Sequence, residues 1–376
     1  MGPGSHAGPR TRAADPPGAV PAGPPDVAGE GPSYSDRVNG DWLIRGRDGR
    51  LSIYLTSDGA VLCRAERTPG GPWDPPRRIG GAQKLHPVLA VGHGPDGYGH
   101  LTSWRPTVKG EAGLVHSTHY RPLLAALDWV PIGHPDKKGD RTGTPAVAVD
   151  AQGRAHVFVR NGAAGIAMVA QKEKGGWDPW CALPGEGAAQ EPVAVTGESG
   201  CVEVYAAGSG ALLHWRQREP GARPVLEETL DVVPARPGTL RALATSPEHT
   251  TLFFTDDSGD VRAWRPGDKP VPVLPAAGPG PVAAIRCVLD GHDCTLLAQR
   301  SASGRVAFAA YPTEQESAGA WWTESGPRLP ADTEVALAVD HEGRVVAATL
   351  SPSTGRLLLT RRKDEPGLAL TAWQEM

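Results

Sequence analysis

Residues 144–183 read TPAVAVDAQGRAHVFVRNGAAGIAMVAQKEKGGWDPWCAL, and this stretch decides the fold. It divides into four short segments of strand-forming residues: 145–149, 154–160, 166–171 and a fourth that opens at Trp177. Turn signals separate them, and Asn161-Gly162 is the strongest short hairpin signal among these. Four antiparallel strands joined by short turns, within about forty residues, are typical of one blade of a β-propeller.

The same unit recurs along the chain about every 49 residues, seven times, from about residue 41 to the end. Matching the centre of the second strand aligns one residue in each repeat: Ile53, Leu101, Val157, Val204, Leu252, Leu296 and Ala347. The predicted fold is therefore all-β, a seven-bladed propeller of four-stranded antiparallel blades over residues 39–376. A closed ring of blades is one domain, even in a chain of 376 residues.

Residues 1–38 have a different composition, rich in Pro, Gly, Ala and Arg and almost without large apolar side chains. Such a segment cannot offset the entropy lost on ordering, so we predict a disordered N-terminal arm. The repeats begin in a first strand and end in a fourth, so the ring can close without a swapped strand. Residues just before Asp41 could nevertheless add one.

Two residue types mark positions within the blades. First strands carry a small residue where seven strands crowd around one axis: Ala90, Ala148, Ala194, Ala283 and Ala338. Fourth strands open with tryptophan in five blades: Trp73, Trp129, Trp177, Trp321 or Trp322, and Trp373. A large ring at this place is expected to pack one blade face against the next.

Composition excludes several classes of protein. The net charge is −4 and spread thinly, which argues against a nucleic-acid surface and a basic membrane patch. No run of 18 apolar residues exists, so no membrane span is expected. Five cysteines without tight spacing are not a disulfide framework; Cys287 and Cys294 flank a hairpin turn and are read as buried free thiols. No secretory signal is visible, so the cytoplasm is the default location, with non-classical export as the alternative.

The repeat resembles that of the PLL-like seven-bladed bacterial lectins, a family related to tectonin and fucose-binding-lectin repeats. That family's repeat reads approximately P-x-V-x-V, D-G-R-x-E-V-F, A-L-x-H-x-W-Q and G-W-x-x-W-x-x-L-G. The corresponding positions here are residues 145–149, 153–158, 212–217 and 176–183. The resemblance covers about nine-tenths of the chain and is more specific for the fold than for the ligand.

The resemblance implies a function and a set of binding residues. Members of the family bind fucose or O-methylated sugars between adjacent blades, where tryptophan stacks on the sugar and polar groups hold its hydroxyls. Carried over to this sequence, the residues implied for a sugar or another small polar ligand are Trp177, Trp180 and Gln171, followed by Trp73, Trp215 and Gln217.

The sequence also departs from the family pattern. Only blade 3 keeps both tryptophans, since blade 1 has Pro76 in the second place and blade 4 lacks the fourth-strand tryptophan. The position of the glutamine that ends the family's A-L-x-H-x-W-Q segment holds different residues around the ring: Glu66, His119, Gln171, Gln217, Pro266, Tyr311 and Arg362. We therefore expect few working sites, and the alternative is that the tryptophans only pack blades.

Histidine supplies a second hypothesis, an enzyme of secondary metabolism (a cyclase, lyase or hydrolase) built on a degenerate propeller. Six of the twelve histidines fall in blade 2, and His93, His100 and His119 are the catalytic candidates. His116 and His119 lie three apart on one strand, so they should point to opposite faces. A third hypothesis is a protein-interaction platform that uses the propeller face or the N-terminal arm.

No motif implies a cofactor or a metal. Residues 92–97 match G-x-G-x-x-G, but a strand follows instead of the helix that would present its N–H groups to phosphate. Residues 256–260 are acidic but lack the remaining ligands of a calcium loop. We find no catalytic signature motif, which favours the binding hypothesis over the enzyme.

Overall fold

The computed structural model describes residues 1–2, 38–80, 83–108, 111–121, 123–136, 143–208, 210–231 and 236–376. Pro32–Met376 form one compact unit. Of the preceding unit, Met1–Gly31, only the first two residues are described, so the predicted arm lies almost wholly outside the described residues.

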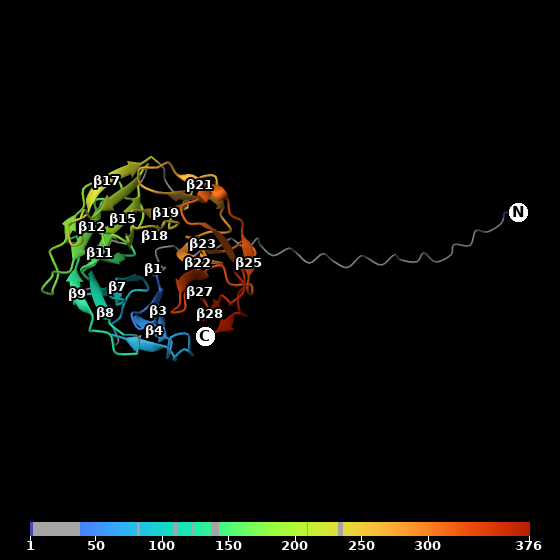
Figure 1. The fold of residues 1–376 in the computed structure, drawn as a ribbon, viewed down its shortest axis with the longest axis horizontal. Helices are drawn as coiled ribbons and strands as arrows, with labels where there is room; N and C mark the ends of the chain where they lie inside the picture. The colour runs from blue at the N-terminus through green and yellow to red at the C-terminus, as the bar shows by residue number, and fades with distance from the viewer. Residues whose placement is uncertain are drawn as a thin grey trace. The chain divides into compact units, whose positions relative to one another are not determined.

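Seven sheets form a ring, which confirms the predicted seven-bladed propeller (Figure 1). Blades 1 and 2 contain β2 (Leu43–Arg45), β3 (Leu51–Ser57), β4 (Ala60–Ala65) and β5 (Arg77–Ile79), then β6 (Leu89–His93), β7 (Gly99–Pro106), β8 (Ala112–His119) and β9 (Val130–Gly133). Blades 3 and 4 contain β10 (Ala146–Val149), β11 (Ala155–Arg160), β12 (Ile166–Ala170) and β13 (Cys181–Ala182), then β14 (Val193–Thr196), β15 (Val202–Ala207), β16 (Leu212–Arg216) and β17 (Val225–Leu230).

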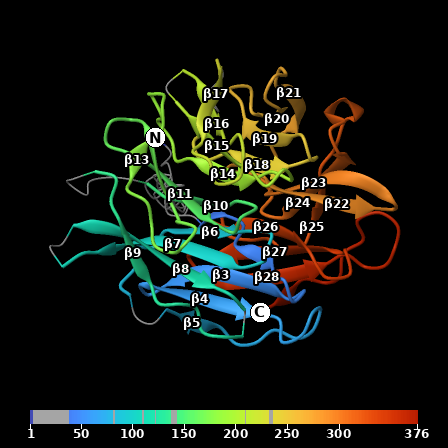
Figure 2. The same ribbon diagram turned by 60° about the vertical axis from the view of Figure 1, so that its left-hand side comes forward.

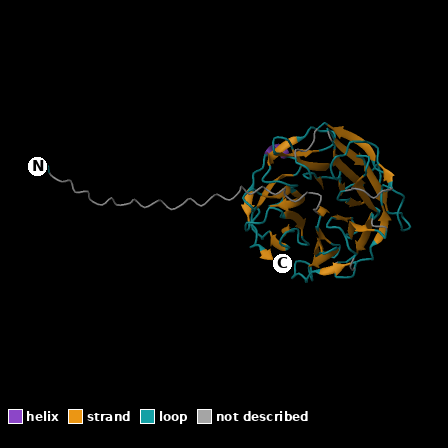
Figure 3. Cartoon of the chain, turned by 180° about the vertical axis from the view of Figure 1, so that it is seen from behind, coloured by secondary structure: helices purple, strands orange, loops and turns teal. Residues whose placement is uncertain are grey.

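The remaining three blades follow the same order. They contain β18 (Arg241–Ala244), β19 (Thr250–Thr255), β20 (Asp260–Trp264) and β21 (Val271–Pro275); β22 (Ala283–Leu289), β23 (His292–Arg300), β24 (Val306–Pro312) and β25 (Thr323–Ser325); and β26 (Glu334–Val339), β27 (Val345–Ser351), β28 (Arg356–Arg361) and β29 (Gln374–Glu375). The one helical element among the described residues is the short 3-10 helix η2, Glu316–Ala318 (Figure 3). No described helix is long and apolar enough to cross a membrane.

Blade 3 has the first three predicted strands, but its fourth strand begins at Cys181 rather than at Trp177, and the predicted hairpin turn is also different. Asn161-Gly162 is not a two-residue connection, because five residues separate β11 from β12. The Asn161 N–H donates to Gly165 O at 2.9 Å, and Asn161 Oδ1 accepts the N–H groups of Ala163 and Gly165. Positive φ falls on Ala164 (57°), so the asparagine side chain organises a wider loop.

An additional strand, β1 (Val38–Gly40), lies at the centre of the ring (Figure 1). It pairs in parallel with β6 and makes blade 2 a five-stranded sheet. Asn39 Nδ2 donates to the carbonyl oxygens of Pro145 and Pro192, at 3.0 and 2.8 Å, where the first strands of blades 3 and 4 begin. Residues before Asp41 therefore do add a strand, but this strand does not close the ring.

The core lies between blades, and each apolar cluster joins residues of adjacent blades. Tryptophans reach from one blade to a glycine at the end of the fourth strand of the preceding blade. The rings of Trp129, Trp180 and Trp373 cover Gly80, Gly133 and Gly326, where a Cβ would lie within 3.4 Å of an indole atom. This contact confirms that these three rings pack adjacent blades together.

Blade 7 closes the ring directly against blade 1, and the two blades lie side by side in both views (Figures 1 and 2). Arg361 of β28 forms ion pairs with Glu66 of blade 1 and with Asp340 of its own blade. Both carboxylates are fully buried. Closure therefore rests on apolar packing and a buried charge cluster rather than on a shared sheet.

Candidate functional site: the junction of blades 2 and 3 and the axial channel

Trp177 and Trp180 lie at the junction of blades 2 and 3. Both side chains are half-buried and pack against the apolar cluster that the two blades share. Trp177 meets the His116 ring edge-on, with ring centroids 4.9 Å apart. Trp180 donates its Nε1–H to the Ile132 carbonyl oxygen at 2.6 Å. Trp180 therefore connects the blades, and Trp177 retains the freer ring.

Gln171 lies next to Trp177, because the two residues form an isolated antiparallel bridge. Its Oε1 accepts the Ala155 N–H at 3.1 Å, at the start of β11. Its Nε2 makes no hydrogen bond to another of the described residues, and the side chain is only half-buried. The amide donor of Gln171 is thus free beside an accessible indole ring.

The corresponding residues of two other blades have a structural role. Gln217 Oε1 accepts the Val202 N–H at 2.7 Å, and its Nε2 donates to Ala222 O at 2.7 Å. Glu66 Oε2 likewise accepts the Leu51 N–H at 2.9 Å. In both blades the side chain at this position accepts the backbone N–H of the first residue of the second strand. Gln217 is 1% exposed and has no atom left for a ligand.

The two remaining predicted ligand residues differ in exposure. Trp215 is fully buried, and its Nε1–H donates to Pro184 O at 2.6 Å, so no face of the ring reaches solvent. Trp73 is half-buried and packs on the apolar cluster shared by blades 1, 2 and 7. Its backbone forms an isolated antiparallel β-bridge with Glu66. The structure does not bring either residue to the junction that holds Trp177.

The three histidines proposed for catalysis do not converge. His119 faces blade 1, where its Nδ1 accepts the Tyr54 hydroxyl at 2.9 Å and its Nε2–H donates to Leu124 O. His100 is buried and hydrogen-bonds His116 at 3.1 Å, on the side that faces Trp177. His93 is exposed at the axial channel. His116 and His119 point to opposite faces as predicted, and the three candidates share no reaction centre.

The first strands of the blades surround an axial channel with two cavities, which the sequence did not predict. Its narrow chamber has a volume of about 140 Å³ and its wide chamber about 650 Å³. Asp41 and Arg241 line both chambers and form an ion pair where the chambers meet. Ligand pockets typically have volumes of about 300–1,000 Å³. The wide chamber is therefore large enough for a small molecule.

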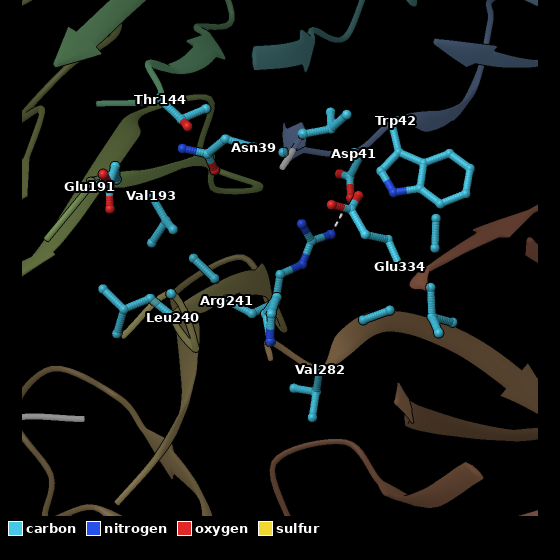
Figure 4. Close-up of a pocket in the computed structure, with 18 of the residues that line it drawn as sticks. Asn39, Asp41, Trp42, Thr144, Glu191, Val193, Leu240, Arg241, Val282 and Glu334 are labelled. Atoms are coloured by element: carbon cyan, nitrogen blue, oxygen red, sulfur yellow. Dashed lines mark hydrogen bonds and ion pairs between the residues drawn. The ribbon is translucent and has the colours of Figure 1, made fainter. Parts of the chain in front are cut away.

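The narrow chamber is shaped by β1 (Figure 4). Asn39, Asp41 and Arg241 point toward its centre, with Glu334 beside them. Loss of water around the Asp41 carboxyl opposes ionisation, but the Arg241 guanidinium and, more weakly, His93 outweigh it and hold its pKa below the usual value. The pair is therefore ionised at neutral pH.

The lining of the wide chamber combines aliphatic and basic side chains. Leu43, Leu243 and Ile285 are among its wall residues. Its charged and titratable lining residues are Arg45, Arg47, Arg241, Arg286, His93, His341 and Asp41. Four arginines against one carboxylate is an unusual balance in a protein with net charge −4.

One sequence signal could have revealed the channel. Strand pairing aligns one innermost residue per blade in six blades: Ala90, Ala146, Val193, Arg241, Ala284 and Ala336. Arg241 is the only charged residue in this set. Its partner Asp41 gave no such signal, because it precedes the first regular strand of blade 1.

The comparisons concern the fold. No protein-family model and no curated protein matches the sequence. The BP39L lectin from Burkholderia pseudomallei is similar in structure, with a TM-score of 0.65 and 14% identity over 90% of this chain and 98% of that one. A mutant of AofleA from Arthrobotrys oligospora gives 0.51 and 12%, over 77% and 86% of the two chains. A polysaccharide lyase of family PL25, an ulvan lyase bound to -[GlcA(1-4)Rha3S]-, gives 0.54 and 12%, over 88% and 93%. The chain thus has the propeller fold of these proteins.

Proposed function

We propose that this protein is a carbohydrate-binding propeller whose sugar site lies at the junction of blades 2 and 3. Trp177 supplies a ring for the C–H face of the sugar, and Gln171 Nε2 supplies a donor for a hydroxyl. The observation that carries the proposal is this pairing of an accessible indole with an unused amide donor. Similar structures include a lectin and a polysaccharide lyase bound to a saccharide, which supports a saccharide as ligand.

The test is a glycan-array screen of the purified protein, followed by calorimetric titration of each hit. Trp177→Ala should weaken binding by roughly 1–3 kcal/mol, the scale of one large apolar side chain. Gln171→Glu is the sharper variant, because the carboxylate still accepts the Ala155 N–H but has no amide donor. It should weaken binding without loss of stability.

Trp321→Ala is the matched control, since Trp321 is 78% exposed in blade 6 and far from blade 3 in the ring. It removes an exposed indole outside the proposed site and should leave the affinity unchanged. Absence of binding to every glycan, or a hit that responds equally to Trp177→Ala and Trp321→Ala, would refute the proposal.

A further inference from the structure

The wide chamber of the axial channel is a second place where a ligand can bind. None of the residues of the blade 2–3 junction lines it. Part of its lining is aliphatic, and among its lining residues the only aromatic rings are the imidazoles of His93 and His341. Such walls suit a hydrocarbon body better than a sugar, which prefers an aromatic face and a set of polar partners.

Not all the basic groups of the chamber are already neutralised. Arg241 is paired with Asp41, and Arg286 with Asp293 and Glu198. Arg45 and Arg47 make no ion pair with any of the described residues, and both are exposed at the chamber. Two guanidinium groups without a carboxylate partner among the described residues therefore lie at a partly aliphatic cavity.

Arg45 is also held in position. Its Nη1 donates to the backbone carbonyl of Asp340 at 2.8 Å, which fixes the guanidinium without cancelling its charge. The backbone of Arg47 is closely packed, since a Cβ at Gly97 would lie 2.4 Å from the Arg47 nitrogen, and its side chain is exposed. A positively charged donor that is held in place beforehand, as Arg45 is, binds carboxylate, sulfate or sulfonate oxygens with less loss of entropy.

We propose that the wide chamber binds a small organic anion, with a carboxylate, sulfate or sulfonate group at Arg45 and Arg47 and an apolar body against Leu43, Leu243 and Ile285. The features that recognise this ligand class are the held guanidinium of Arg45 and the exposed guanidinium of Arg47, beside aliphatic side chains. The site is independent of the sugar site proposed above.

The test uses 8-anilinonaphthalene-1-sulfonate as the probe and N-phenyl-1-naphthylamine, which lacks the sulfonate, as its neutral counterpart. The wild-type protein should bind the sulfonate saturably, one per chain, by fluorescence and calorimetry. The Arg45→Gln/Arg47→Gln double variant should bind it at least tenfold more weakly. Affinity should also fall as salt is raised, since the groups are exposed.

The matched control is Arg218→Gln/Arg356→Gln, which removes two exposed arginines outside the chamber. It should leave sulfonate binding unchanged, and circular dichroism should show both double variants folded. Equal loss in both double variants, equal affinity for the neutral counterpart, or no saturable binding would overturn the proposal. A negative glycan screen would leave it standing, because that screen tests the other site.

Discussion

Asp41 and Arg241 are 200 residues apart in the sequence and form an ion pair inside the axial channel. Asp41 follows β1, and Arg241 opens the first strand of blade 5. The pair therefore links the N-terminal strand to a blade other than the one with which that strand pairs. It also lies where the two chambers meet, since both residues line each of them.

The pair makes stability depend on pH. The folded-state pKa of Asp41 is lowered, so its contribution is present above the unfolded value of about 3.9 and is lost as pH falls through the folded value. Asp41 is 38% exposed, so we expect Asp41→Asn to cost only about 1 kcal/mol at pH 7. The free energy of unfolding in urea, measured for wild type and Asp41→Asn at pH 7 and pH 3, gives this loss of stability.

The difference between wild type and Asp41→Asn should be smaller at pH 3 than at pH 7. Asp58→Asn is the control, because Asp58 is 86% exposed in a turn of blade 1. A difference that is unchanged at pH 3, or as large for Asp58→Asn, would show that the ion pair is not its source.

Gly40 is predicted to be essential for the pairing of β1 with β6. It has φ of +90°, and a Cβ there would lie 2.1 Å from the Val91 carbonyl oxygen, the backbone with which β1 pairs. Gly267 has nearly the same φ (+92°), but a Cβ added there would meet no atom within 4 Å. Gly267→Ala should cost about 1–2 kcal/mol from backbone strain alone, and Gly40→Ala clearly more.

Limited proteolysis distinguishes loss of the close contact with Val91 from backbone strain alone. Gly40→Ala should expose the N-terminal segment to cleavage near residue 40, whereas Gly267→Ala should not. Equal unfolding free energies and equal proteolysis of the two variants would mean that the contact with Val91 is unimportant.

His100 and His116 predict a loss of stability in mild acid. Burial and the nearby His93 lower the pKa of His100 to about 4, and burial and His100 lower the pKa of His116 well below its usual value. Below about pH 6.5 the unfolded chain takes up protons that the folded protein does not. The two share a hydrogen bond, so they titrate as a pair.

His100→Gln should remove part of this loss of unfolding free energy in mild acid, up to about 2 kcal/mol at pH 5. The measurement is the free energy of unfolding between pH 7 and pH 5. The exposed His341, replaced by Gln, provides the control. A wild-type profile that is flat over this range would contradict the prediction.

The strands that recur in every blade could be predicted from the sequence, whereas the pairing of the single additional strand β1 could not. Strand centres such as Val157 and Val204 align because alternating apolar residues recur in every blade. The parallel strand β1 has only three residues, and its pairing uses backbone groups that leave no side-chain pattern. Its partner β6 was predictable, but the contact between them was not.

The candidate site shows the same division. The family motif places Trp177 and Trp180 in blade 3, but motif letters do not distinguish the half-buried Trp177 from the fully buried Trp215. They also do not separate Gln171, which keeps a free donor, from Gln217, which does not. Exposure and hydrogen bonding depend on the neighbouring blade, which a repeat motif does not describe.

The cysteines are expected to differ in reactivity. Cys287 and Cys294 lie directly opposite each other on β22 and β23, as free buried thiols. Burial raises the pKa of Cys287, and of Cys63 in blade 1, to about 12. Cys181 is half-exposed. N-ethylmaleimide at pH 8 should therefore label Cys181 first, since the thiolate is the nucleophile.

Mass spectrometry of the labelled protein gives the order of modification. In urea all five cysteines should react at similar rates, which serves as the control. Rapid labelling of Cys63 or Cys287 in the folded protein would contradict the buried positions.

Closure of the ring is predicted to depend on Arg361, because it is the guanidinium that pairs with both Glu66 and Asp340. Arg361→Met keeps the apolar stem but leaves Glu66 Oε1 buried without its charged partner. Asp340 loses less, since Arg344 and the N–H groups of Glu342 and Arg344 still reach it. We expect a loss of roughly 3 kcal/mol, the scale for removing one partner of a buried pair.

Arg356→Met is the matched control on the same strand, because Arg356 pairs with Glu375 at the surface, with side chains 41% and 64% exposed. It should change the unfolding free energy by less than about 0.5 kcal/mol. Since no strand is shared between blades 7 and 1, Arg361→Met should also speed hydrogen exchange in β2 and β28 before other blades open. Equal effects of the two variants, or uniform exchange, would mean that apolar packing alone holds the ring closed.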